Sequence, residues 1–285
     1  MPETPSSGID RWVSLATSFV APVTVISAVL FYFGYVAARA QYDYFGLDVD
    51  VIGLSTRAYV MRSPQPLLTP MLVLTFGGVA VVAFHHWVRR HATKSWFGRV
   101  VTAVLGTGLV LLAAGTLLLA GFSFVGGWAY YSLVAPVLLG GGAALVAYAL
   151  RLRGPLEPRI VLLWVGVAAC VVWATATTAQ WTGRGLAMEQ ARNLRSLPSV
   201  VLDTRERLYI PASAGVEEAA RPDTGEDGYR YRYWRLRLLI QGDDRMFLVP
   251  ETWSPGGTTI LVRLDDDVQV QFQFRNSPPG PRTGS

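Results

Sequence analysis

The stretch HHWVRRHATK, residues 85–94, contains all three histidines of the chain together with three basic side chains. Imidazole groups can hold a metal ion, and basic groups can bind nucleic acid. Two metal ligands on one face of a helix must be three or four residues apart, whereas His85, His86 and His91 are separated by one, five and six residues. We therefore expect no metal ion at this stretch, and no cofactor elsewhere in the chain.

Carboxylates gather early in the chain, where Asp43, Asp48 and Asp50 lie within eight residues. Three such groups could bind Ca²⁺, but the glycine and glutamate that complete a calcium-binding loop do not follow them. Aromatic residues typical of a membrane interface surround them, namely Tyr42, Tyr44 and Phe45. The segment 39–65 is predicted to be either a packed cap or a partner-binding loop.

Two local structures are predicted within this segment. Ser55 is placed to cap a short helix, TRAYVMR, that must end before Pro64. Residues 47–51 alternate between apolar and acidic side chains, as a short strand would.

The stretch YRYRYWRLRLLI, residues 229–240, alternates basic and aromatic side chains. In a strand, Arg230 and Arg232 would share one face, and basic groups interleaved with aromatics can bind single-stranded nucleic acid. Asp203 and Glu206 could instead neutralise these arginines across strands. We expect no nucleic acid, and either a solvated sheet face or a surface for an anionic cell-wall polymer or a protein partner.

Two residue types that many catalytic sites require, histidine and cysteine, are absent from residues 184–285. Ser-His-Asp, Cys-His and zinc-type sites therefore cannot form there. Asp243 and Asp244 are paired carboxylates, as are the residues of the run 265–267, but both groups lie in predicted turns, where water keeps them ionised. We expect no catalytic site and no enzyme activity.

The elements that carry these residues follow from the distribution of charge. Residues 100–150 contain no charged side chain in 51 positions, which a water-soluble domain cannot sustain because its helices need a polar face. About 20 apolar residues cross the hydrocarbon layer of a membrane. Five transmembrane spans are predicted, at about 12–38, 66–88, 100–122, 129–150 and 160–182, so that residues 1–183 form a transmembrane domain with an outer loop at 39–65.

The basic residues predict how the chain is oriented. The stretch from Arg89 to Arg99 carries four positive charges between the second and third spans, and that from Arg151 to Arg159 carries a net two between the fourth and fifth. Lys and Arg accumulate in cytoplasmic loops. We therefore expect a multi-pass protein of the cell membrane with a cytoplasmic N-terminus and an extracytoplasmic C-terminal domain. Residues 184–285 hold 14 basic and 14 acidic groups, so the net charge of +5 arises in the membrane half.

The predicted spans contain small residues in place of ionisable ones. Gly140 with Ala144 and Ala143 with Ala147 are four residues apart, a spacing that lets helices pack closely. Further glycines lie at positions 77, 78, 106, 108 and 166, and Cys170 is expected to be a small packing residue. A conduit lined by threonines is the alternative, formed by Thr107, Thr116, Thr175, Thr177 and Thr178.

The chain changes character after the fifth span. Residues 184–197 are predicted to form a connecting helix, and residues 198–275 a β-rich domain, either a sandwich or an open barrel. Its strands are expected within 199–210, 229–240, 245–253 and 258–274, with hairpin turns at 242–244 and 265–267. The last residues, 276–285, are expected to be a disordered tail.

The early run FYFGYVAARAQYDYFGLDVDVIGLSTRAYVMRS, together with VVLDTRERLYI, YRYRYWRLRLLI, RMFLVPETW and ILVRLDDDVQVQF, resembles a group of membrane proteins from high-GC actinobacteria. The resemblance covers most of the chain and implies a place in the cell envelope. It implies no activity and no functional residues.

The chain is thus predicted to combine an α-helical transmembrane bundle with a small extracytoplasmic all-β domain. The favoured function is an integral membrane envelope protein whose β domain is an interaction or sensory module. The alternative is an oligomeric channel or lipid-handling protein. Expected partners are membrane lipids, a second copy of the chain, and a protein or anionic wall polymer. The candidate interaction surface consists of Tyr42, Tyr44, Phe45, Asp48, Asp50, Arg230 and Arg232.

Overall fold

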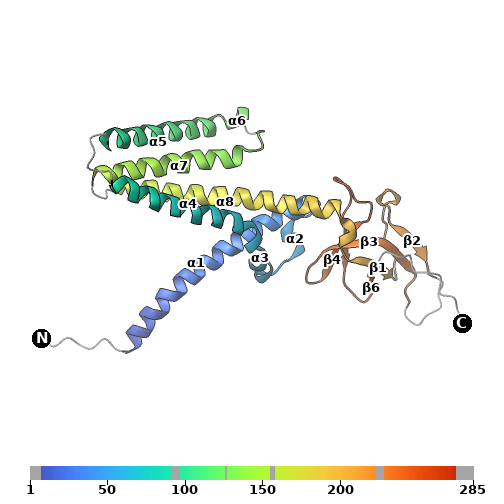
Figure 1. Ribbon diagram of the computed structural model, residues 1–285. Helices are drawn as coiled ribbons and strands as arrows, with labels where there is room; N and C mark the ends of the chain where they lie inside the picture. Colours follow the sequence, from blue (N-terminus) through green and yellow to red (C-terminus); the bar gives the residue numbers. More distant parts are fainter. Residues whose placement is uncertain (1–7, 91–96, 126, 155–157, 222–227, 274–285) are drawn as a thin grey trace. The chain divides into compact units, whose positions relative to one another are not determined.

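The computed structural model describes residues 8–90, 97–125, 127–154, 158–221 and 228–273 (Figure 1). The expectations for His91, Lys94 and Glu157, and for the tail at 276–285, lie outside these residues. The chain divides into two compact units, one formed by residues 63–181 and the other by residues 1–62 and 182–285.

The unit formed by residues 63–181 is helical. Its helices are α4 (Pro64–Arg90), α5 (Phe97–Ala120), the one-turn α6 (Phe122–Val125), α7 (Tyr131–Arg153) and the first part of α8 (Pro158–Arg192). Helices α5 and α7 run side by side (Figure 1). Small residues allow this pairing, because a Cβ atom on Gly142 would lie 2.8 Å from the carbonyl oxygen of Gly108.

The predicted packing glycines divide into two groups. Gly108 and Gly140 lie in helix contacts, and a Cβ on Gly140 would lie 2.8 Å from the Cβ of Cys170, so the cysteine is a packing residue as expected. By contrast, a Cβ on any of the other predicted glycines would have no described atom within 4 Å, and these are Gly77, Gly78, Gly106 and Gly166. Pro136 lies inside α7, and Pro70 lies inside α4.

Within the described residues, five helices are long and apolar enough to cross a membrane. They cover Val23–Asp43, Pro64–Arg90, Phe97–Ala120, Tyr131–Arg153 and Pro158–Arg192. The first of these belongs to α1 (Gly8–Asp43). Their apolar side chains remain largely exposed. In α4, for example, only 6% of the most apolar stretch of 18 residues is buried. Exposure of this kind is expected where lipid is the solvent, so these helices suit a multi-pass membrane protein.

The other unit begins with α1, which is followed by two short helices, α2 (Val49–Ile52) and α3 (Thr56–Arg62). Ser55 caps α3 as predicted, because its hydroxyl accepts a hydrogen bond from the Ala58 N–H at 3.3 Å. The predicted strand at 47–51 is wrong, since Val49–Ile52 is a helical turn. Its N-cap is Asp48, whose carboxylate accepts the N–H of Asp50 at 3.1 Å.

The segment predicted as a connecting helix is the end of α8, which runs without a break to Arg192. A 3₁₀ turn, η1 (Leu194–Ser196), leads from it into a six-stranded antiparallel sheet. The strands are β1 (Ser199–Thr204), β2 (Glu217–Ala220), β3 (Tyr231–Gln241), β4 (Arg245–Pro250), β5 (Ile260–Arg263) and β6 (Val268–Gln273). A second 3₁₀ turn, η2 (Ala212–Ala214), precedes β2.

The strand order is β5-β4-β3-β1-β6, and β2 also pairs with β3. The turn at 242–244 joins the hairpin of β3 and β4, as predicted. The predicted hairpin at 265–267 is wrong, because β5 and β6 lie at opposite ends of this order. Instead, β5 pairs with β4 and β6 pairs with β1. The local turn between β5 and β6 therefore does not set their pairing.

Both faces of β4 are buried. Phe247 and Val249 belong to one hydrophobic cluster, while Met246 and Leu248 belong to another on the opposite face. Continuous apolar runs are typical of strands covered on both sides. The cluster of Met246 and Leu248 also contains residues from β1, β3 and β5 and from the segment between β1 and β2. The cluster of Phe247 and Val249 packs against the helices of the same unit.

Candidate interaction surface

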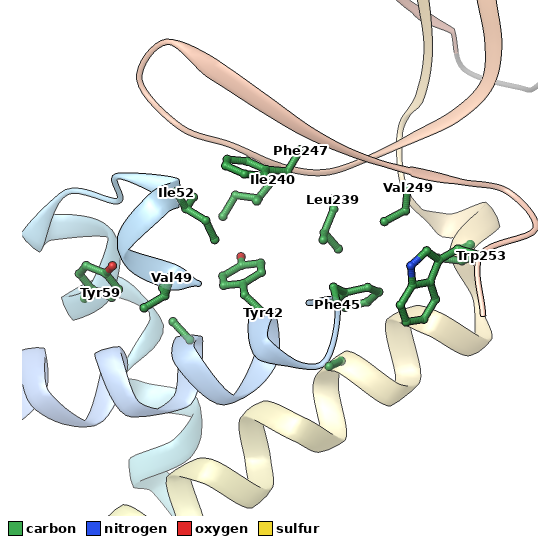
Figure 2. Close-up of a cluster of buried hydrophobic side chains, with 13 residues drawn as sticks. Tyr42, Phe45, Val49, Ile52, Tyr59, Leu239, Ile240, Phe247, Val249 and Trp253 are labelled. Atoms are coloured by element: carbon green, nitrogen blue, oxygen red, sulfur yellow. The ribbon is translucent and has the colours of Figure 1, made fainter. Parts of the chain in front are cut away.

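Tyr42 and Phe45, two of the predicted interaction residues, lie in the interior of the protein. They belong to the docking core, a cluster in which residues 38–59 and α8 pack against the sheet (Figure 2). Phe45 is 1% exposed, and the centroid of its ring lies 4.8 Å from the centroid of the Trp253 ring. The sheet and residues 38–59 therefore share one hydrophobic core. The buried members are Ala38, Tyr42, Phe45, Val49, Ile52, Tyr59, Ala187, Leu194, Leu239, Ile240, Phe247, Val249 and Trp253.

Polar contacts fix the loop on the sheet. The Thr259 hydroxyl donates to the carbonyl oxygen of Phe45 at 2.7 Å, and the Arg245 guanidinium donates to the carbonyl of Val51 at 3.4 Å. Gly242, in the β3–β4 turn, lies against Ile52, where any Cβ would collide with the Ile52 carbonyl oxygen. Only glycine fits this turn while the loop is docked.

Side-chain contacts also tie α2 and α3 to α1. The Arg62 guanidinium donates to the Tyr42 hydroxyl at 2.5 Å, and its Cζ lies 5.5 Å from the centre of the Tyr42 ring. The Tyr35 hydroxyl donates to both carboxylate oxygens of Asp50 at 3.2 Å. Burial is the main cause that raises the pKa of Tyr59, which lies between these groups.

The remaining loop residues of the predicted surface are more accessible. Asp48 and Asp50 are exposed, and Tyr44 is half-buried beside Phe45 and Trp253. Both aspartates already have intramolecular partners, the helix cap and Tyr35. Among the described residues, no three His, Cys, Asp or Glu side chains gather closely enough to hold a metal ion. In the other unit, His85 Nδ1 lies 3.1 Å from the Tyr148 hydroxyl.

Arg230 and Arg232 have different surroundings. Arg232 forms a bidentate pair with Asp203, with both N···O distances at 2.6 Å, and Asp203 is fully buried. Arg221 and Gln271 also donate to Asp203. The neutralisation of Arg232 by Asp203 is thus confirmed, and the Asp203 hydrogen bond is the main cause that raises the pKa of Arg232. Arg230 lies just outside β3 and is exposed.

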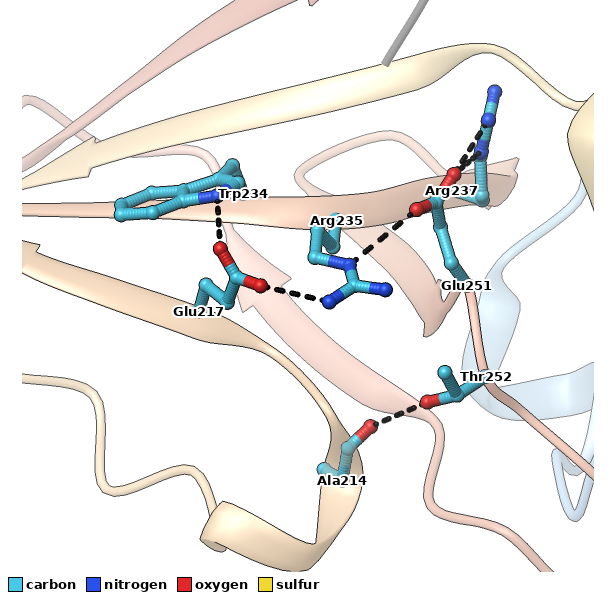
Figure 3. Close-up of polar contacts among 7 residues, drawn as sticks. All are labelled: Ala214, Glu217, Trp234, Arg235, Arg237, Glu251 and Thr252. Atoms are coloured by element: carbon cyan, nitrogen blue, oxygen red, sulfur yellow. Dashed lines mark hydrogen bonds and ion pairs between the residues drawn. The ribbon is translucent and has the colours of Figure 1, made fainter. Parts of the chain in front are cut away.

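A second polar cluster was missed by the sequence reasoning. Glu217 accepts hydrogen bonds from the Trp234 indole and from Arg235, both at 2.7 Å, and Arg235 also lies 3.6 Å from Glu251 (Figure 3). The Arg235 hydrogen bond is the main cause that lowers the pKa of Glu217. Arg235 has a φ of 65°, the left-handed region that side chains with a Cβ rarely adopt.

The position of Arg235 explains its backbone. Along one edge of β3, β2 pairs with residues 231–234 and β4 with residues 236–241. Arg235 lies at the change of partner and bridges Glu217, which begins β2, to Glu251, which follows β4. No local sequence signal other than the flanking arginines marks this residue.

Arg237 joins the sheet to η1 and the residue that follows it. It is 5% exposed, donates to Glu251 at 2.6 Å, and donates to the carbonyl oxygen of Leu197 at 2.9 Å. Arg232, Arg235 and Arg237 of β3 therefore each form an ion pair that joins two segments of the chain. In the described part of the sheet, the prominent exposed apolar side chains are Tyr209, Leu261 and Phe272.

No known protein family matches this sequence, and no curated protein or solved structure is significantly similar to it. The function is therefore inferred from the geometry described above.

Proposed function

We propose that the protein is an integral membrane protein of the cell envelope whose β sheet binds a partner outside the cytoplasm and transmits that contact to the membrane helices. The docking core is the observation that carries this proposal. It joins the end of α1, the first outer loop and the end of α8 to both β3 and β4 in one buried cluster. A displacement of the sheet therefore acts directly on two of the candidate membrane helices.

The distribution of charge supports the proposed orientation. Arg89 and Arg90 end α4, and Arg151 and Arg153 end α7, whereas the loop that carries Asp48 and Asp50 is balanced. Under the positive-inside tendency, the ends of α4 and α7 face the cytoplasm. The docking core then lies on the opposite side of the membrane together with the sheet.

The exposed residues indicate what the module offers to a partner. Arg230 is exposed, and Tyr209 is 92% exposed between two residues that pack into the second cluster, Leu208 and Ile210. An exposed arginine and an exposed tyrosine are typical of residues that dominate binding energies. Such residues suit contacts with a protein or an anionic wall polymer, whereas Arg232 is already neutralised by Asp203.

A binding role is favoured over catalysis and over conduction. Asp203, Glu217 and Glu251 are each paired with arginine, so they are not placed as proton donors or acceptors. The hydroxyls of Thr116 and Thr175 donate to carbonyl oxygens of their own helices. They therefore give no support to the alternative of a polar conduit.

Labelling of single cysteines on intact cells tests the orientation. In a Cys170→Ser background, we expect a membrane-impermeant maleimide to label Asp48→Cys and Arg230→Cys, and to label Arg90→Cys only after the membrane is opened. All three positions are exposed in the folded chain. Labelling of position 90 on intact cells, with protection of positions 48 and 230, would invert the proposal.

A further inference from the structure

Among the described strands, β6 forms one end of the sheet, so one of its two edges has no neighbouring strand. The N–H of Arg205 donates to the carbonyl oxygen of Asp267, its partner in the register of β1 and β6. In an antiparallel ladder, residues that face the neighbour alternate with residues that face away. Residues 267, 269, 271 and 273 therefore face β1, and Val268, Val270 and Phe272 direct their N–H and C=O groups outward.

One of these outward groups is already used. The Val268 N–H donates to the carbonyl oxygen of Asp265 in the preceding turn. Within the described part of the chain, the N–H and C=O groups of Val270 and Phe272 have no hydrogen-bond partner. Two donors and two acceptors, two residues apart, are therefore available along this edge.

The side chains of β6 lack the usual protection of an edge strand. Natural edge strands are commonly blocked by lysine, proline or a bulge. The sequence VQVQFQ has no charge and no proline, and its six residues pair with β1 without a register shift. Phe272 is 58% exposed, so the edge also carries an uncovered aromatic ring.

We propose that β6 pairs with β6 of a second copy of this chain, antiparallel about a two-fold axis at Gln271. In this register Val270 lies opposite Phe272 of the other copy, and the four unpaired groups of each chain are all satisfied. Val270 covers the exposed ring, Gln271 meets its own counterpart, and uncharged strands meet without repulsion. The strand is thus complementary to itself, which favours a second copy over an unrelated peptide.

The proposed pair is compatible with a membrane protein. A two-fold axis along the membrane normal keeps both sheets on the same side of the membrane, whichever side that is. The inference therefore stands independently of the orientation proposed above. Isologous two-fold contacts are also the commonest form of self-association.

Disulfide cross-linking of the full-length protein in lipid nanodiscs or detergent tests this pairing. In the Cys170→Ser background, Gln271→Cys places two thiols on the axis, where opposed Cα atoms are about 4.5 Å apart, within disulfide range. Gln269→Cys is the matched control, because it has the same residue type on the same face but lies opposite residue 273. Its two copies would be about 14 Å apart, from four residues at about 3.4 Å each. We expect mild oxidation to give a covalent dimer at position 271 and not at position 269.

A second pair of variants separates backbone pairing from simple collision. Phe272→Pro removes an outward N–H while sparing the ladder with β1, and Phe272→Ala keeps that N–H. In the Gln271→Cys background, we expect Phe272→Pro to reduce the cross-linked fraction at least tenfold, and Phe272→Ala to reduce it less. A monomer by light scattering, equal cross-linking at 269 and 271, or full cross-linking with Phe272→Pro would overturn the proposal.

Discussion

Replacement of Phe45 by alanine tests whether the docking core holds the sheet on the helices. Phe45 is 1% exposed and packs from the segment after α1 onto the sheet, with its ring against Trp253. Its carbonyl oxygen still accepts the hydrogen bond of Thr259 after the change, because that contact is to the backbone. The substitution therefore removes packing alone.

The expected loss follows from the burial of the ring. Truncation of a fully buried phenylalanine to alanine costs about 3–5 kcal/mol, from lost transfer free energy and from the cavity that remains. Where opening is fast compared with cleavage, the rate of proteolysis follows the population of the open form. A cost of about 3 kcal/mol then corresponds to a rate increase on the order of 100-fold, since about 1.4 kcal/mol is a factor of ten.

Trypsin digestion of the protein in membranes measures this rate, at Arg195, Arg205 and Arg207 on either side of β1. Tyr209→Ala is the matched control, because this aromatic side chain is 92% exposed and its loss should change stability by about 0.5 kcal/mol or less. The reasoning is refuted if Phe45→Ala is cut at the wild-type rate, or if Tyr209→Ala is cut as fast as Phe45→Ala.

Two further predictions concern single backbone positions. Arg235→Gly should be more stable than Arg235→Ala by about 1 kcal/mol. Both variants lose the ion pairs to Glu217 and Glu251, but only glycine accepts a φ of 65° without strain. Chemical denaturation of the two variants shows which of them is more stable. Gly142→Leu should lower the thermal stability of the detergent-solubilised protein, because a Cβ there would lie 2.8 Å from backbone atoms of α5. Gly141→Leu should leave that stability unchanged or raised, since nothing lies within 4 Å of its Cβ position; an equal loss in both variants would contradict the described contact of α5 and α7.

The helices and most strands were predictable because their signals are local. Uncharged apolar runs specify the candidate spans, and alternating β-branched and aromatic residues specify β1, β3, β4 and β6. The helix at 56–62 was predictable for the same reason, since its cap at Ser55 and its stop at Pro64 lie within ten residues. The bounds shifted by a few residues, most at α1 and α8, because an amphipathic extension continues each helix past its apolar run.

Features set by distant residues were not predictable. Residues 47–51 alternate as a strand would, yet the side chain of Asp48 caps a helical turn there, and four residues are too few for periodicity to decide. The connection between β5 and β6 reads as a hairpin, but β5 pairs with β4 and β6 pairs with β1, and both partners come earlier in the chain. The burial of Tyr42 and Phe45 likewise depends on residues about 200 positions away, which aromatic composition alone does not reveal.

The docking core also has a consequence for how the protein is made. The Thr259 hydroxyl and the Phe45 carbonyl oxygen that it contacts are 214 residues apart in the chain. During synthesis, Tyr42, Phe45 and Ile52 therefore emerge long before β3, β4 and Trp253 exist to cover them. Contacts of such long range form slowly and leave apolar surface exposed meanwhile, which chaperones recognise. A chain that stops short of residue 253 would retain its helices yet keep that surface open, so this core can distinguish finished chains from unfinished ones.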